Sequence, residues 1–182
     1  TSQVACIDSK FGDADHGLTM AKIAGAISEA VDAAEGGIQS MLDDAAMAVM
    51  TLNGGSAVPL WNTWLDGLQE EAPEGEEIDV AGLKAIFAKA LEELEDMSGA
   101  KVGDKTMMDA LIPASEAVAA YTGDSADELF DAAAQAAAQG AEATKQYVSK
   151  FGRAKSYGTK TIGTPDAGAV SMSWFFQGLA RE

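Results

Sequence analysis

The sequence is poor in cysteine and in basic residues, and each shortage excludes a class of protein. Its one cysteine, Cys6, excludes a disulfide framework and a thiolate zinc site. Only 12 lysines and arginines stand against 29 acidic residues, which gives a formal net charge of -17. A chain this acidic lacks the basic footprint needed to bind nucleic acid or an anionic membrane surface. No apolar run is long enough to span a bilayer and no signal peptide is recognisable, so we expect a cytoplasmic protein.

Strand patterns are missing as well, whereas nearly every apolar segment repeats at helical spacing. The length of 182 residues fits one domain, residues 1–182. We therefore expect an all-α fold, an antiparallel up-and-down bundle of six to eight helices. The predicted helices cover residues 17–33, 38–52, 59–70, 80–97, 106–121, 126–150 and 168–180. Asp79 and Ser125 are predicted N-caps, the second in a capping box with Glu128, and residues 151–167 are predicted to form a long loop.

The most unusual segment is residues 8–17, here called the acid turn. It gathers Asp8, Asp13, Asp15 and the only histidine, His16, before the first long helix. Carboxylate oxygens suit a hard cation such as Mg²⁺, and a helix N-terminus favours anions, so the turn suggests a metal-phosphate complex. An EF-hand is excluded, because glycine and alanine stand where that loop needs ligands. The alternative is a solvated acidic turn in which Asp15 caps the helix and His16 is a packed or capping residue.

Three further loops carry glycine: residues 53–59, 99–106 and 152–168. Alternate connections of an up-and-down bundle lie at the same end, so we expect these loops and the acid turn to converge on one ligand. The amides at Gly54-Gly55 could face phosphate, although a plain helix–helix turn is the alternative, and no Walker or Rossmann pattern is present. The segment 103–106 is equally typical of a capped turn. Arg153 could neutralise phosphate or be a surface charge.

In combination, the glycine-bearing loops resemble those of one known family. The motifs are Gly12-Asp13-Ala14-Asp15-His16-Gly17, Gly54-Gly55, Gly103-Asp104-Lys105-Thr106-Met107, Gly152-Arg153-Ala154 and Asp166-Ala167-Gly168. They are similar to motifs of the nucleotide-binding L subunit, or L domain, of the dihydroxyacetone kinase family (DhaL/Dak2-like), over nearly the whole chain. The resemblance implies an eight-helix barrel-like bundle with ADP or ATP bound at one end. The family's first helix is largely missing before the acid turn, and the chain starts at Thr1, which suggests processing or a piece of a longer chain.

The resemblance also assigns roles to individual residues. It implies two Mg²⁺ ions held by the carboxylates of Asp8, Asp13 and Asp15. The catalytic residues it implies are Asp13, Asp15 and Arg153. Nucleotide contacts are implied at His16, Gly17, Leu18, Thr19, Gly55, Ser56, Ala57, Gly99, Thr106, Met107, Arg153, Asp166 and Gly168. Two departures stand out: Ser56-Ala57 replaces the family's frequent Ala-Ser, and Ala167 replaces its usual proline.

The activity implied by the resemblance is that of a kinase subunit, which transfers a phosphoryl group to a small hydroxyketone such as dihydroxyacetone or a four-carbon analogue. In the family the ketose is held on a histidine of a separate K subunit or domain. Because the only histidine here lies in the acid turn, we expect no activity without a K partner. The donor is either exchanged ATP or a phosphoprotein that recharges bound ADP. Two alternatives stay open: a nucleotide-binding regulatory module that contacts a transcription factor, and a plain helical interaction domain.

Overall fold

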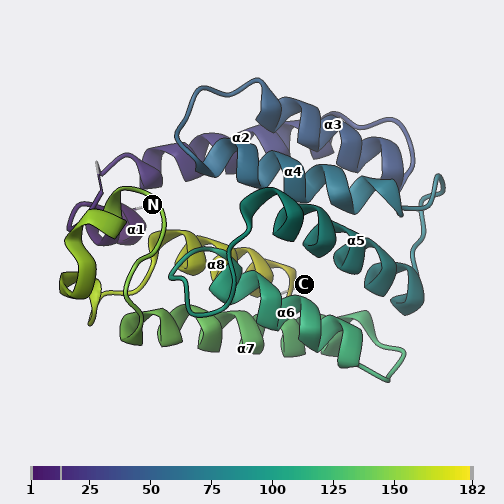
Figure 1. Ribbon diagram of the computed structural model, residues 1–182. Coiled ribbons are helices and arrows are strands. Elements are labelled where there is room, and N and C mark those ends of the chain that lie inside the picture. Colours follow the sequence, from purple (N-terminus) through teal and green to yellow (C-terminus); the bar gives the residue numbers. More distant parts are fainter. Residues whose placement is uncertain (1, 13, 181–182) are drawn as a thin grey trace. The chain divides into compact units, whose positions relative to one another are not determined.

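The computed structural model describes residues 2–12 and 14–180 (Figure 1). Within these ranges the chain is all-α and contains no strand, which confirms the predicted fold class. The α-helices are α1 (Ser2–Asp8), α2 (His16–Ala33), α3 (Ile38–Met50), α4 (Ala57–Glu70), α5 (Val80–Ser98), α6 (Met108–Ala120), α7 (Ala126–Ala143) and α8 (Ala167–Leu179). Two 3-10 helices, η1 (Thr144–Gln146) and η2 (Arg153–Thr161), lie between α7 and α8. None of the described helices is both long and apolar enough to cross a membrane.

The chain divides into two compact units. The first combines the residues up to Leu18 with the residues from Ala100 onward, so both ends of the chain contribute to it. The second is the continuous segment Thr19–Gly99. The acid turn therefore belongs to the same unit as the loops before α6 and α8.

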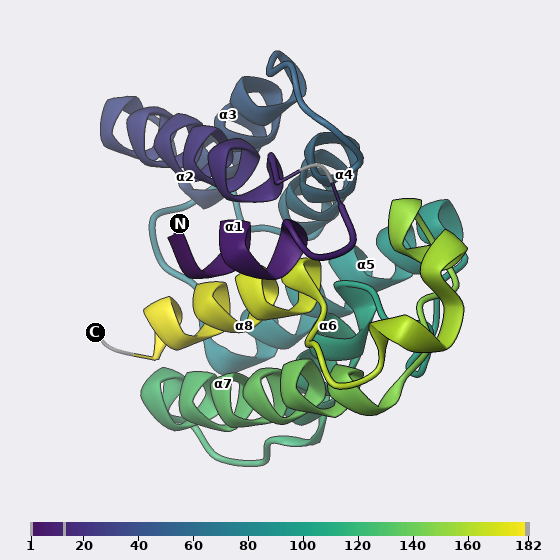
Figure 2. The same cartoon turned by 90° about the vertical axis from the view of Figure 1, so that its left-hand side faces the viewer.

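In the first unit, α6 and α7 form a helical hairpin, and α8 packs against both (Figure 1). The short helix α1 packs against α8, beside which it lies in Figure 2. The hairpin is tight because α7 is rich in small residues. A Cβ atom added at Gly140 would lie 2.0 Å from the backbone oxygen of Asp109 on α6. The alanine-rich sequence of α7 thus lets its neighbour approach to backbone contact.

In the second unit, α4 packs between α3 and α5. Its buried aromatic residues Trp61 and Trp64 meet edge to face with ring centroids 5.6 Å apart, and Trp64 also contacts Phe87 of α5. Such aromatic pairs add stability beyond the area they bury. The predicted cap of α5 is confirmed, since the Asp79 carboxylate accepts a hydrogen bond of 2.7 Å from the Gly82 amide.

Several element boundaries differ from the sequence prediction. Helix α7 ends at Ala143 and does not reach residue 150; the chain continues as η1 and becomes extended at Tyr147, with φ -99° and ψ 150°. The predicted loop over 151–167 contains η2, whose short helical stretches are separated at Gly158 with φ 55°. Helix α1 precedes the acid turn, where no helix was predicted.

Only one of the two hydrogen bonds of the predicted capping box forms at the start of α7. The Ser125 hydroxyl accepts from the Glu128 amide at 3.3 Å, as predicted. The Glu128 carboxylate, however, accepts from the Tyr121 hydroxyl at 2.9 Å, and the Ser125 amide donates to the same tyrosine oxygen. Tyr121 therefore takes the place of the reciprocal hydrogen bond of a full box.

Candidate functional site

The acid turn folds around the carboxylate of Asp8, the last residue of α1. Its Oδ2 accepts a hydrogen bond of 3.3 Å from the His16 backbone amide at the start of α2. Gly12 lies directly against it, because a Cβ there would be 2.0 Å from Asp8 Oδ1. Ala14 takes the left-handed conformation, with φ 62°. A carboxylate is thereby fixed at the N-terminus of a helix, where negative charge is favoured.

The structure describes two of the three predicted metal ligands. Asp8 is half-buried and Asp15 is exposed, while Asp13 lies outside the described residues. Within residues 2–12 and 14–180, no group of three or more histidine, cysteine, aspartate or glutamate side chains is placed to hold a metal ion. A magnesium ion usually takes one or two carboxylates and keeps several waters, so Asp8 and Asp15 are a chemically suitable pair. The three-carboxylate site stays a prediction.

His16 connects the acid turn to α8. Its Nε2 lies 3.0 Å from the Ser171 hydroxyl oxygen. The same hydroxyl lies 3.0 Å from the Ala167 carbonyl oxygen, to which it can donate. Burial lowers the pKa of His16 most strongly, against the opposing effect of the charges on Asp8 and Asp15. At neutral pH the ring is therefore an uncharged link between the two helix starts.

The loop before α6 is a capped turn, as its sequence predicts. The Thr106 hydroxyl accepts from the Met108 amide at 3.2 Å. The Asp109 carboxylate accepts from the amides of Thr106 at 2.7 Å and Gly103 at 2.6 Å. Burial raises the pKa of Asp109 in spite of these bonds. Its side chain closes the turn and fixes the direction of the first amides of α6.

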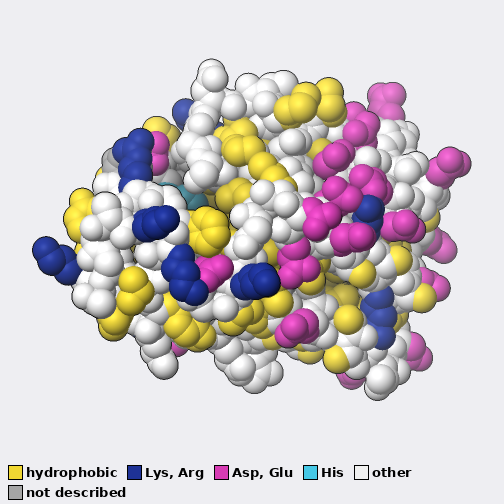
Figure 3. Space-filling model, viewed as in Figure 1, with side chains coloured by type: hydrophobic (Ala, Val, Ile, Leu, Met, Phe, Trp, Pro, Cys, Tyr) yellow, Lys and Arg dark blue, Asp and Glu magenta, His cyan; other side chains and the backbone are white. Residues whose placement is uncertain are grey.

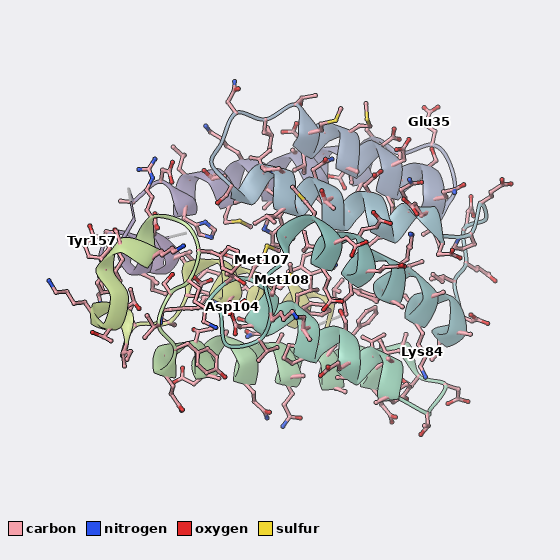
Figure 4. The ribbon with its side chains drawn as sticks, viewed as in Figure 1. Glu35, Lys84, Asp104, Met107, Met108 and Tyr157 are labelled. Carbon is pink, nitrogen blue, oxygen red and sulfur yellow. The ribbon has the colours of Figure 1, made fainter. Side chains whose placement is uncertain are left out.

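A surface ion pair holds the same loop from outside. The Lys150 ammonium lies 2.5 Å from an Asp104 oxygen, and the Lys150 amide donates to the Asp104 carbonyl. The hydrogen bond from Lys150 is the largest effect that lowers the pKa of Asp104. Asp104, Met107 and Met108 lie together where the loop enters α6 (Figure 4).

Helix α8 begins beside the start of α6. The Asp166 carboxylate caps it by accepting from the Ala169 amide at 2.8 Å, and burial raises the pKa of Asp166 to about 6. A Cβ at Gly168 would lie 3.3 Å from Met107 Cβ, so glycine permits close approach of the two helix ends. Ala167 is the first residue of α8, a position that accepts proline in a helix.

The segment that carries Arg153 meets the acid turn. Tyr157 of η2 and Phe11 pack edge to face, with ring centroids 5.3 Å apart. Arg153 is the exposed first residue of η2, and its neighbours Lys155 and Lys160 are exposed as well. Figure 3 shows Lys and Arg side chains gathered over this part of the first unit. These contacts bring three of the four predicted loops together: the acid turn, the loop before α6, and residues 152–168.

The remaining predicted contacts belong to the second unit. Thr19 is buried, and a Cβ at Gly54 would meet its Cγ2 at 2.9 Å. The Gly55 and Ser56 positions are exposed, and Ser56 makes no side-chain capping bond to α4. The others are Ala57, the buried first residue of α4, and Gly99, the left-handed C-cap of α5.

Sequence reasoning gave no role to four residues that build this site: Lys105, Asp109, Thr144 and Ser171. The spacing of Thr106 and Asp109 matches a helix-capping pattern and could have indicated Asp109. Ser171 lies 155 positions from His16, and a single sequence carries no signal for that pair. Thr144 and Lys105 likewise act through contacts between distant segments.

Comparison with known proteins identifies the family. The family model of the DAK2 domain matches residues 10–181. The chain belongs to the DAK2-domain family. This confirms the DhaL/Dak2-like resemblance. The L-erythrulose kinase of Pectobacterium atrosepticum is 35% identical over 191 residues, which cover 98% of this DAK2-domain chain and 31% of that kinase.

Two further comparisons agree with the assignment to the DAK2-domain family. The ADP-binding subunit DhaL of the PEP-dependent dihydroxyacetone kinase of Escherichia coli is 28% identical, over 96% of this chain and 84% of that subunit. The crystal structure of the dihydroxyacetone kinase from C. freundii in complex with AMP-PNP and Mg²⁺ superposes with a TM-score of 0.75 at 25% identity, over 98% of this chain and 30% of that one. The chain thus spans about a third of the erythrulose kinase and most of the DhaL subunit.

Proposed function

We propose that this chain is the nucleotide- and Mg²⁺-binding subunit or domain of a dihydroxyacetone-type kinase. It provides the phosphoryl group for transfer to a small hydroxyketone held on a separate K-type partner. The observation that carries the proposal is the meeting of the N-terminal ends of α2, α6 and α8 in the first unit. The His16–Ser171 pair joins α2 to α8, and the approach of Gly168 to Met107 joins α8 to α6.

Converging helix starts suit a nucleotide phosphate. The first amides of each helix have no acceptor within the helix, and they carry the positive end of its dipole. Gly17 and Leu18 supply such amides in α2, Thr106 and Met107 flank those of α6, and Gly168 lies in the first turn of α8. Together with Asp166, these are the nucleotide contacts that we propose in this part of the chain.

The acid turn has the donor chemistry for magnesium. Asp8 is fixed by Gly12 and by the His16 amide, and Asp15 stands one residue before that amide. We propose these two carboxylates as ligands, with Asp13 as the third. Bound magnesium would neutralise phosphate charge, which is its usual contribution to phosphoryl transfer.

Arg153 adds positive charge on a segment that contacts the acid turn. Its helix, η2, is anchored there by the Phe11–Tyr157 contact, so the guanidinium group lies on a segment tied to the metal ligands. An arginine so placed can bind phosphate oxygens and stabilise the charge that develops during transfer.

A K-type partner is proposed because this chain has no second histidine that could bind the ketose. Its only histidine, His16, is half-buried and bonded to Ser171. Relatives named as erythrulose kinases support a four-carbon ketose as acceptor, and a relative named as a dihydroxyacetone kinase supports a three-carbon one. Those relatives are about three times as long as this chain, and the added length leaves room for a ketose-binding domain.

Isothermal titration of ADP with and without Mg²⁺ tests the proposal. We expect wild type to bind ADP only with the metal, and Asp8→Asn to weaken binding by about 100-fold or more, since even groups that only orient a metal ligand contribute 10–100-fold. Asparagine keeps an oxygen that can accept from the His16 amide, so the turn should stay folded. Asp13→Asn should behave in the same way.

The matched control is Asp127→Asn, which removes an exposed carboxylate from the first turn of α7. It should leave ADP binding unchanged. Metal-independent binding, or equal binding by Asp8→Asn and Asp127→Asn, would show that the acid turn holds no metal. Addition of a ketose-loaded K subunit, with ATP or with a phosphoprotein donor, should then give phosphoryl transfer that neither protein shows alone.

A further inference from the structure

Lys105 is a buried lysine in the loop before α6. Only 4% of the residue is exposed. The ammonium nitrogen donates to the Thr144 carbonyl at 2.5 Å and to the Thr164 carbonyl at 2.6 Å. These acceptors lie 39 and 59 positions further along the chain, and both residues are buried. One cation therefore joins three segments that are distant in sequence.

The local backbone and the surrounding charges indicate that the ammonium group is held in a defined place. Lys105 has φ 61°, a left-handed conformation that residues other than glycine rarely adopt. Burial lowers the pKa of the Lys105 ammonium group, and the charges of the Asp166 and Asp109 carboxylates oppose that effect by favouring the protonated form. Backbone carbonyls together with nearby carboxylates form the surroundings that a small cation prefers.

The segments that Lys105 joins are those that carry the helix starts. Thr106 and Met107 follow it directly, and Thr164 precedes the Asp166 cap of α8 by two residues. Thr144 contacts both of these segments, because its carbonyl accepts from Lys105 and its hydroxyl accepts from the Asp166 amide at 2.8 Å. The ammonium group thus fixes the start of α6 relative to the start of α8.

We propose that Lys105 is a positioning residue, an internal cation that holds the starts of α6 and α8 in the arrangement that binds nucleotide. A free ammonium ion can replace it when the side chain is shortened. This inference rests on the proposed nucleotide site. Lys105 touches no ligand in this account and acts through Thr106, Met107 and Asp166.

The test compares Lys105→Ala with Lys150→Met by titration of ADP in Mg²⁺. Lys150 ties the same loop through Asp104 but lies on the surface, so it is the matched control. We expect Lys105→Ala to lose about tenfold or more in ADP affinity, because hydrogen bonds from a buried charged group contribute at least that much. Lys150→Met should change the affinity by less than about threefold, as exposed ion pairs contribute little.

Recovery of ADP affinity in ammonium chloride distinguishes the positioning role of the Lys105 ammonium group from a role of its side chain in packing. Both variants are titrated in ammonium chloride and in tetramethylammonium chloride, each at about 0.1 M so that screening is equal. Ammonium carries the N–H donors of the lost side chain, and tetramethylammonium has none. Ammonium should recover most of the affinity of Lys105→Ala and leave wild type and Lys150→Met unchanged.

Every other outcome contradicts either the positioning role of Lys105 or the proposed function. If wild type binds ADP and Lys105→Ala binds it equally well, the positioning role is wrong and the nucleotide site stands. If ammonium and tetramethylammonium act alike, the side chain serves packing and not cation placement. Should Lys105→Ala be unfolded in tetramethylammonium, its failure to refold in ammonium overturns the proposal. Absence of ADP binding by wild type overturns the proposed function and this inference together.

Discussion

Asp79 and Asp166 have the same task in the two units, but their surroundings differ. Each caps a helix by accepting from the amide three residues later, at 2.7 Å and 2.8 Å. Asp79 is exposed, whereas burial raises the pKa of Asp166 to about 6. A cap that water can reach contributes stability at little cost, while a buried carboxylate pays a desolvation penalty whenever it is charged.

The raised pKa of Asp166 predicts a stability difference that depends on pH. Because its folded pKa is above the usual value near 4, the cost of charging it is fully present above pH 6 and disappears as the pH falls through 6 toward 4. Asp166→Asn, which keeps a cap acceptor, should therefore have a free energy of unfolding about 3 kcal/mol higher than wild type at pH 8. Urea unfolding without nucleotide or metal, at pH 8 and pH 4.5, measures this.

Asp79→Asn is the control for that experiment, because it makes the same change at an exposed cap. The two pH values should give the same small difference between Asp79→Asn and wild type. If the advantage of Asp166→Asn is equally large at pH 4.5 and pH 8, or is absent at both, the assignment of a buried charged carboxylate is wrong.

At the scale of elements, the contact between α6 and α7 depends on the absence of a side chain at Gly140. Gly140→Ala would place a methyl group 2.0 Å from the Asp109 backbone oxygen, and no rotamer change can move a backbone atom away. We expect the hairpin to open slightly and the free energy of unfolding to fall by about 1–3 kcal/mol, the usual cost of overpacking. Thermal and urea unfolding measure the change.

Gly178→Ala on α8 provides the matched comparison. An added Cβ there meets nothing within 4 Å, so alanine should be neutral or stabilising by about 0.5–1 kcal/mol through its higher helix propensity. Equal effects of the two substitutions would mean that helix propensity, and not the approach of α7 to α6, decides stability at Gly140.

The elements that could be predicted are those whose signals are local. The Asp79 cap and the start of α7 at Ser125 follow from side chains that bond amides three residues away, and both are confirmed. The start of α8 at Ala167 was predicted within one residue. By contrast, η2 depends on positive φ angles at Gly152 and Gly158, and glycine in a loop does not reveal which conformation it takes.

The site could be predicted only as far as its motifs reach. The motifs named His16, Met107 and Gly168, and the structure brings these together in the first unit. The residues that hold them in place, such as Lys105 and Ser171, act between segments far apart in the sequence. Pattern and spacing describe neighbours along the chain, so contacts of this kind need a fold before they can be seen.

At the scale of the whole molecule, charge is the dominant property. A net charge of -17 makes the folded chain repel itself, and salt screens that repulsion. Raising NaCl from about 0.02 M to 0.3 M should raise the melting temperature, by about 2–4 °C for each kcal/mol of repulsion removed. Differential scanning calorimetry at neutral pH measures the rise.

The same salt series near pH 4.2, the isoelectric point of the sequence, is its control. There the net charge approaches zero, and the effect of salt should almost vanish. A rise of equal size at both pH values would indicate a general salting-out effect, and a fall at neutral pH would mean that attractive ion pairs outweigh repulsion in this chain.

The first unit is assembled from both ends of the chain, and this constrains the order in which the protein can mature. During synthesis the continuous segment Thr19–Gly99 is complete before α6 to α8 exist, so it can fold on the ribosome first. The acid turn is made before that segment, but His16 can meet Ser171 only once α8 has been made. The acid turn therefore passes through the synthesis of α2 to α7 without the α8 residue that His16 contacts.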